Sequence, residues 1–400
     1  MDRRTFLGGM TAVFLTVFLS VSTVAAADFT FTRQRLFPGF DGKYCKICPC
    51  VGTDGGTDVF LTWQRLLLSG SDVFYGTFMS RSEDAGRTWS EPVEVKGIPD
   101  VRADGVRTAY AAEAHYSVKN GRWYALGHSQ DYHNDSVPDT ASADGRPYQV
   151  PYQYAFDPKT GTFSDGRPLP VPFAFAGAYP FGQAVELDDG DLLVGFQCRP
   201  PEAKTFHLTT YVVRYRFDGA DLKPVACGRP ITRADFARGL YEPSLARWNG
   251  RFFLTLRSDE MGMFCTSDDG LDYTAPEPWR FDDGSPIGNR NTQQHWIVSP
   301  QALYLAYTRE GANNDHVFRN RAPIFIARYD PQRRCLVRST EMPLVPELGA
   351  RLGNFAVTPH GDEQWLVTAE WMQPAGCERY GSDNSIWLVK LKFPAAGRER

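Results

Sequence analysis

Short apolar segments recur along this chain at similar intervals, with polar turn residues between them. The segments are five residues long and rich in leucine, aromatic and β-branched side chains, a composition typical of buried β-strands. Most of them directly follow a Gly-containing turn such as Asn249-Gly250, and strand, Asn-Gly turn and strand together form a hairpin. They cover residues 59–63, 123–127, 192–196, 252–256, 303–307 and 365–369, with steps of 64, 69, 60, 51 and 62 residues between their first positions.

The length of this repeat predicts the architecture. A unit of 51 to 69 residues suits a four-stranded propeller blade, whereas a β-helix needs a much shorter unit and an array of β-sandwiches lacks a uniform period. A single blade cannot bury both faces of its sheet, so only the closed ring is stable. The sequence therefore predicts an all-β, six-bladed β-propeller with four antiparallel strands per blade, in which the repeated segments are the inner strands.

The beginning of the chain has a different character. Arginines stand at positions 3 and 4, an apolar run covers 10–24, and alanines occupy 25–27, which is the order of a signal peptide with its cleavage site. The arginine pair favours the twin-arginine export route, and the run is short for the alternative, a membrane anchor. We predict a signal peptide over 1–27, one propeller domain over 28–400 without a membrane span, and a periplasmic or extracellular location.

Composition narrows the classes of partner. The net charge of -4 and the mixed distribution of charges leave no basic stripe for nucleic acid. Aromatic residues at 14%, 36 glycines and 28 prolines favour short strands and tight turns over helices. No cofactor is predicted, and because a closed ring needs no partner, we expect a monomer.

Eight cysteines in an exported chain are first interpreted as disulfides. Cys45, Cys48 and Cys50 lie close together and could also form part of a metal site. A zinc site would need a second close Cys or His pair, and the other cysteines stand alone. The sequence therefore favours disulfides or free buried thiols over a metal.

Two segments carry a turn motif of the form Ser-x-Asp-x-Gly-x-Thr-Trp. An Asp side chain can accept backbone N–H bonds within such a turn, and Gly supplies the positive φ. These carboxylates are therefore expected to be structural. The first copy is complete, with Ser82, Asp84, Gly86 and Trp89, and the second is degraded, with Asp268 and Gly270. Such a motif is an Asp-box, and in its two Asp-boxes the chain resembles the sialidase (neuraminidase) superfamily of propellers.

The resemblance implies a site at one mouth of the central channel. Sialidase-type enzymes use three arginines for a substrate carboxylate, an Asp as general acid, and a Tyr nucleophile activated by a Glu. A Tyr suits an anomeric centre beside a carboxylate, and the guanidinium fork binds that carboxylate in a bidentate way. By position along the chain, Asp72 resembles the acid, Glu242 and Arg257 the Glu and second arginine, Arg309 or Arg321 the third arginine, and Tyr380 the nucleophile.

The chain departs from the family at the first arginine. The alignment places Lys46-Ile47-Cys48 where sialidases have Arg-Ile-Pro, and lysine lacks the planar fork. A different acidic sugar, such as a uronic acid, or a ligand with no charged group at all, then becomes plausible. Laying the six units over one another gives Lys46 the same place as His115, Gln183, Glu242, Gln294 or His295, and Asn354.

Three functions remain open from the sequence. The leading hypothesis is a secreted glycoside hydrolase acting on an acidic or complex glycan, with Asp72, Glu242 and Tyr380 as catalytic residues. A lyase acting on uronate-containing glycans would instead use His128 or His295 with Tyr380, and a glycan-binding propeller would have no turnover. In each case the partner is a carbohydrate, and the predicted contacts are Lys46, Arg257, Arg309, Arg321, His128, His295 and Asn354.

Overall fold

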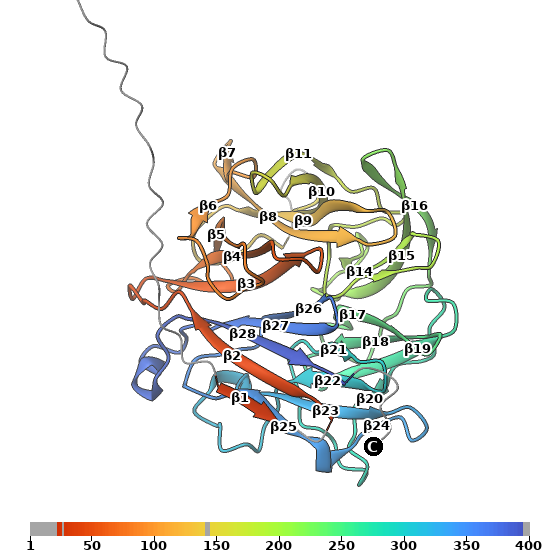
Figure 1. Ribbon diagram of the computed structural model, residues 1–400. Coiled ribbons are helices and arrows are strands. Elements are labelled where there is room, and N and C mark those ends of the chain that lie inside the picture. The colour runs from red at the N-terminus through yellow and green to blue at the C-terminus, as the bar shows by residue number, and fades with distance from the viewer. Residues whose placement is uncertain (1–21, 26–27, 141–144, 395–400) are drawn as a thin grey trace, which may run out of the picture.

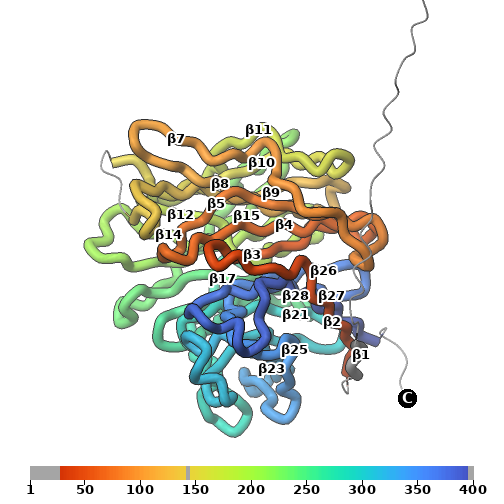
Figure 2. Tube along the Cα trace, turned by 90° about the vertical axis from the view of Figure 1, so that its left-hand side faces the viewer, coloured from red at the N-terminus to blue at the C-terminus, as the bar shows by residue number. Residues whose placement is uncertain are grey.

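The computed structural model describes residues 22–25, 28–140 and 145–394, and strands form nearly all of its regular structure. They are arranged as six blades around one axis (Figure 1). Figure 2, turned by 90°, places β7 and β11 at one edge of the ring and β23 and β25 at the other. The predicted all-β, six-bladed propeller is confirmed. In the described ranges, three short 3-10 turns interrupt the strands: η1 (Phe318–Asn320), η2 (Arg338–Thr340) and η3 (Cys377–Tyr380).

The first three blades follow one another along the chain, each from the axis outward. Blade 1 is β3 (Tyr44–Thr53), β4 (Val59–Leu67), β5 (Phe74–Ser82) and β6 (Val93–Glu94). Blade 2 is β8 (Val106–Ser117), β9 (Arg122–Tyr132), β10 (Gln149–Asp157) and β11 (Thr162–Pro168), with β7 (Val101–Ala103) paired to β8. Blade 3 is β12 (Gly177–Pro180) and β13 (Val185–Glu186), then β14 (Leu192–Arg199), β15 (Thr209–Asp218) and β16 (Asp221–Cys227).

The last three blades complete the ring. Blade 4 is β17 (Tyr241–Trp248), β18 (Arg251–Arg257), β19 (Met263–Ser267) and β20 (Glu277–Pro278). Blade 5 is β21 (His295–Val298), β22 (Leu303–Tyr307) and β23 (Ile324–Asp330), with β24 (Cys335–Leu336) and β25 (Met342–Val345) both paired to β23. Blade 6 is β26 (Phe355–His360), β27 (Glu363–Ala369), β28 (Ile386–Lys392), β2 (Thr30–Leu36) and β1 (Ser22–Ala25).

The ring is closed by a strand from the other end of the chain. β2 pairs antiparallel with β28 along its whole length, from Thr30 opposite Lys392 to Leu36 opposite Ile386. The last blade therefore has four strands without β1, which falls inside the predicted signal peptide. Residues 1–21 and 26–27 of that prediction lie outside the described residues. No helix in the described ranges has the length and hydrophobicity needed to cross a membrane.

The repeated apolar segments are second from the axis, not innermost as the sequence analysis expected. They lie in β4, β9, β14, β18, β22 and β27, and in five blades a Gly-containing turn joins the segment to the inner strand that precedes it, whereas the turn of blade 5, residues 299–302, has no glycine. The physical reason is burial. A second strand packs against neighbouring blades on both faces, whereas an innermost strand turns alternate side chains toward the channel and so carries polar residues.

Apolar and aromatic side chains fill the spaces between blades. Between blades 4 and 5, Trp279 and Trp296 are fully buried, with ring centroids 5.4 Å apart, and Tyr329 packs edge-on against both. This arrangement rigidly fixes the blade carrying Glu242 against the blade carrying Arg321.

The two Asp-boxes lie on the outer hairpins and satisfy their polar groups internally. Asp84 accepts hydrogen bonds from Ser82, from the Arg87 and Thr88 backbones, and from the Thr88 hydroxyl at 2.7 to 3.0 Å. In the second box the turn is one residue shorter, so the carboxylate in this role is Asp269. Asp268, the residue predicted for it, is exposed and pairs with Arg251 at 3.1 Å.

All eight cysteines have free thiols, so the expected disulfides are not formed in this structure. Six of the thiols are buried, as in the alternative that the sequence left open. Within the described residues, no group of three or more His, Cys, Asp or Glu side chains has an arrangement that could hold a metal.

Candidate functional site

A cavity of about 1760 Å³ lies on the propeller axis and is lined by residues of all six blades. The turn after β4 and the innermost strands β3, β8, β12, β17 and β26 all contribute to its wall. Because each blade presents different polar groups there, this is the part of the molecule where six similar units form one asymmetric site.

Two innermost strands each turn a side chain into the cavity at a β-bulge. Cys48 on β3 and Glu242 on β17 have positive φ values, both 48°, each precedes a proline, and each lies at a β-bulge. A bulge redirects the side chain of the extra residue, here toward the axis. Cys48 therefore occupies the place in blade 1 that the sequence analysis gave to Lys46. The Lys46 ammonium turns away and donates to the Asn384 carbonyl at 2.8 Å.

Glu242 forms an ion pair with Arg257 inside the cavity wall. The Arg257 guanidinium donates to Glu242 Oε1 at 2.5 Å, and both side chains are largely buried. Burial opposes the charge on Arg257, but the neighbouring carboxylate raises the pKa of this guanidinium above its ordinary value. Glu242 Oε2 is buried without a hydrogen-bond partner among the described residues, and it is the free acceptor of this pair.

Four more arginines line the cavity: Arg238, and the three that we call, with Arg257, the arginine cluster. Arg321 is 2% exposed, and its one hydrogen-bond acceptor among the described residues is the backbone carbonyl of Asn291, at 2.6 and 3.2 Å. Arg351 donates to Gln373, and its guanidinium lies 3.7 Å from the Trp371 ring. The cluster consists of Arg257, Arg319, Arg321 and Arg351.

Most of this cluster has no counter-charge. Within the described ranges, Arg319, Arg321 and Arg351 form no ion pair with a carboxylate, and the one carboxylate bonded to the cluster is Glu242. Burial, followed by repulsion from Arg257, lowers the pKa of Arg321 well below its usual value. The fold therefore holds a concentrated positive charge against an open cavity, an arrangement complementary to an anion.

Besides Lys46, two predicted residues lie away from the cavity. Arg309 bonds Glu341 through Nε and Nη2, both at 2.7 Å, so this arginine is already neutralised, and of the two alternatives Arg309 and Arg321 the one that lines the cavity is Arg321. Tyr380 lies in η3, is 40% exposed and stacks on His316 with ring centroids 4.4 Å apart. It is absent from the described residues that line the cavity.

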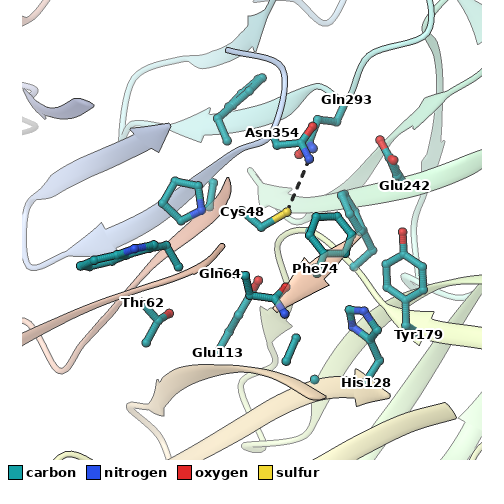
Figure 3. Close-up of a pocket in the computed structure, with 18 of the residues that line it drawn as sticks. Cys48, Thr62, Gln64, Phe74, Glu113, His128, Tyr179, Glu242, Gln293 and Asn354 are labelled. Carbon is teal, nitrogen blue, oxygen red and sulfur yellow. Dashed lines mark hydrogen bonds between the residues drawn. The ribbon is translucent and has the colours of Figure 1, made fainter. Parts of the chain in front are cut away.

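The tyrosine that does face Glu242 is Tyr179, at the start of blade 3. Its hydroxyl end turns toward the strand that carries Glu242, as Figure 3 shows. Burial first and the Glu242 charge second raise the pKa of Tyr179 well above the ordinary value. His128 stacks on the Tyr179 ring, with centroids 4.6 Å apart, and burial lowers the pKa of this imidazole to about 4.

The remaining predicted side chains lie around this centre. Asp72 lines the cavity from the turn after β4, with φ 55°, and its carboxylate acts electrostatically on both Arg351 and Tyr179. His295 is 2% exposed and bonded through both ring nitrogens, to Ser244 at 3.0 Å and Gln293 at 2.6 Å. Asn354 donates to the Cys48 thiol at 3.4 Å (Figure 3).

The sequence analysis missed Tyr179, Cys48, Arg319 and Arg351 as cavity residues. One signal could have found the first two: Cys48-Pro49, Tyr179-Pro180 and Glu242-Pro243 place a residue followed by proline within three innermost strands. Arg319 lies in the long connection from β22 to β23 within blade 5, and Arg351 lies in the connection from blade 5 to blade 6, where the repeat gives no register.

No protein-family profile and no curated protein matches this sequence. Solved structures do match. A protein of unknown function from Dyadobacter fermentans aligns with a TM-score of 0.61 at 14% identity, over 90% of this chain and 98% of that chain. Trypanosoma rangeli sialidase aligns with a TM-score of 0.58 at 14% identity, over 95% of this chain. The fold is that of the sialidase propellers.

This sialidase-like chain spans 60% of the length of the T. rangeli enzyme. A structure of NanB with Optactamide aligns with a TM-score of 0.58 at 11% identity, over 90% of this chain and 70% of that chain. At such low identity the shared property is the architecture, so the side chains in the cavity carry any statement about chemistry.

Proposed function

We propose that this protein is an exported glycoside hydrolase that binds the acidic sugar of a glycan in its axial cavity. The observation that carries the proposal is the set of cavity-lining arginines without a carboxylate partner in the described part of the chain: Arg319, Arg321 and Arg351. Burying a charge is costly unless it is paired, and a guanidinium binds a carboxylate through two parallel hydrogen bonds. T. rangeli sialidase was solved with a difluorinated nononic acid, which is also a sugar acid.

The proposed chemistry uses Asp72, Tyr179 and Glu242. Asp72 protonates the glycosidic oxygen as it leaves. Tyr179 loses its proton to Glu242 and bonds the anomeric carbon, and a water activated by Asp72 then breaks that bond. The raised pKa keeps the Tyr179 hydroxyl protonated at neutral pH, so the nucleophile needs a base, and Glu242 Oε2 is a carboxylate oxygen without a partner in the described residues. Tyr179 replaces Tyr380 in this role because Tyr380 lies outside the cavity wall.

Product analysis of the mature chain tests this proposal. We expect sialylated or uronate-containing glycans to yield new reducing ends without the ultraviolet absorbance of an unsaturated uronate. Tyr179→Phe should lower kcat by about 1000-fold or more, because covalent catalysis is lost. Tyr380→Phe, which removes the same atom from an exposed tyrosine, should leave kcat unchanged. Full activity of Tyr179→Phe would contradict the assignment of the nucleophile.

A second candidate is a polysaccharide lyase, and one observation favours it specifically. His128 stacks on Tyr179 and its lowered pKa keeps the imidazole neutral at pH 7, which is the form that can accept a proton. The arginine cluster would neutralise the uronate carboxylate beside the proton to be removed. In that case the products absorb in the ultraviolet, and His128→Gln abolishes turnover while Asp72→Asn does not. Binding of the glycans without either product would instead identify a glycan-binding propeller.

A further inference from the structure

One uncharged residue holds most of the arginine cluster in place. Asn291 lies between β20 and β21, at a left-handed backbone conformation with φ 50° that asparagine tolerates. Its backbone N–H donates to the Ser258 carbonyl at 2.9 Å, which attaches this turn to the end of blade 4. The residue therefore lies where blades 4 and 5 meet, in contact with arginines that line the cavity.

Asn291 accepts hydrogen bonds from four arginines. Its side-chain oxygen Oδ1 accepts from Arg257, from Arg238 at 3.2 Å and from Arg319 at 3.3 Å. Its backbone carbonyl accepts from Arg321 at 2.6 and 3.2 Å. Because guanidinium groups only donate, the amide oxygen must be the atom that faces them.

The charge balance explains why an amide stands here. Arg238 lies beside the cluster and is neutralised by Asp259, with bonds from Nε at 2.7 Å and from Nη2. The Arg257 charge is matched by Glu242. An amide oxygen orients the remaining guanidinium groups without cancelling their charge, whereas a carboxylate would orient and neutralise them together.

We propose that Asn291 is a positioning residue that keeps the arginine cluster ordered and positively charged, and so makes the cavity selective for an anionic ligand over a neutral one. The ligand class in this statement rests on the proposed function. The role of Asn291 in the charge balance does not rest on the proposed function, so the ligand class and the role of Asn291 can be tested, and can fail, separately.

The decisive variant is Asn291→Asp, which keeps the shape and the acceptor oxygen and adds one negative charge. We expect its Tm at low ionic strength to rise by about 2 °C or more, because repulsion among the arginines is relieved. We expect the affinity for N-acetylneuraminate or D-glucuronate, whichever the wild type binds, to fall at least about tenfold, because the added carboxylate competes for the same donors. A purely structural residue would not give higher stability together with weaker binding.

Two further variants make the test sharp. Asn249→Asp adds the same charge at the same kind of left-handed position, φ 47°, in the exposed hairpin turn of blade 4, and should change neither quantity. Asn291→Gly keeps the backbone conformation but removes Oδ1, and should lower Tm at every salt concentration. If Asn291→Asp lowers Tm as the glycine variant does, or leaves it unchanged, the inference is overturned.

The binding measurement separates the two proposals. Titrations use N-acetylneuraminate and D-glucuronate beside neutral D-glucose. If the wild type binds neither acid, the proposed ligand class fails, and the low-salt Tm of Asn291→Asp still decides the role of Asn291. If the wild type binds an acid and Asn291→Asp binds it equally well, the proposed function stands and the inference fails.

Discussion

The Asp-box turns and the arginine side of the cavity both concentrate charged groups, but they satisfy them differently. In the first Asp-box a single carboxylate, Asp84, accepts four hydrogen bonds from its own turn. In the cavity, Arg321 and Arg351 are held by neutral oxygens and retain their charge. Buried polar groups in folded proteins are normally satisfied, so a group that is satisfied locally stabilises the fold. A charged group left without a counter-charge beside a cavity is where we expect a ligand to bind.

The largest expected effect is on ligand affinity, and it distinguishes Arg321 from Arg309, the two alternatives that the sequence left open. Arg321→Met should weaken binding of a sugar acid by about 100-fold or more, because a desolvated charge is lost from the ligand site. Its effect on the stability of the free protein should be small, because removing an unpaired buried charge offsets the lost hydrogen bonds to Asn291. Titration calorimetry and thermal unfolding measure the two quantities.

Arg309→Met is the matched control on the same blade. It leaves Glu341 buried with only the Tyr307 hydroxyl, so the free energy of unfolding should fall by about 3 kcal/mol while affinity is unchanged. If both variants weakened binding equally, the distinction between satisfied and unsatisfied arginines would carry no functional meaning.

The sequence predicted the architecture because the repeat is a local signal. The apolar second strand of each blade, and the Gly-containing turn that precedes it in five of the six, can be recognised without any knowledge of the other blades. Residues whose place in the cavity depends on how equivalent strands of different blades align were predicted less well. Lys46 was given the place that the bulge at Cys48 occupies, and a bulge adds a residue without changing the hydrophobic pattern.

The candidate site was predictable only where a residue lies next to a repeat element. Glu242 and Arg257 bracket the hairpin of blade 4, and the structure brings them together. Arg351 has no such landmark, because it lies in the connection from β25 to β26 and the connections between blades differ in length. Tyr179 lies on an innermost strand outside the apolar repeat, where its marker is the proline that follows it. Tyr380 was chosen by position along the chain, and the turn of η3 takes its ring outward to His316.

A smaller effect is expected on the structural side of the comparison. Asp84→Ala should lower the free energy of unfolding by about 2 to 3 kcal/mol, since several N–H and O–H donors lose their acceptor, and it should leave binding unchanged. Asp268→Ala, in the second box, removes only an exposed ion pair and should cost about 0.5 kcal/mol or less. Chemical denaturation of the two variants checks both values. A larger loss for Asp268→Ala than for Asp84→Ala would contradict the one-residue shift of the second box.

The dependence of the Asp84 contribution on pH follows from the same hydrogen bonds. Burial tends to raise the pKa of this carboxyl, but the donors from Thr88 and Ser82 outweigh it and lower the pKa below the usual value. The stabilisation is therefore fully present above the unfolded pKa near about 4 and is lost as pH falls through the lower folded pKa. The difference in stability between wild type and Asp84→Ala should shrink below about pH 4.

The smallest effect expected for a cavity residue concerns His295, which resembles the Asp-box groups because both of its ring nitrogens already have partners. Burial lowers the pKa of this imidazole to about 3, whereas in the unfolded chain it is about 6.5. Protons therefore bind the unfolded chain first, and the stability present above about pH 6.5 is lost progressively as pH falls toward 3, by about 1 kcal/mol at pH 6. In His295→Gln this loss should disappear, so its unfolding free energy should fall less between pH 7 and pH 6 than that of the wild type. If the unfolding free energies of wild type and His295→Gln fell equally between pH 7 and pH 6, His295 would not remain neutral in the fold. It would then belong with the unpaired charged groups of the cavity.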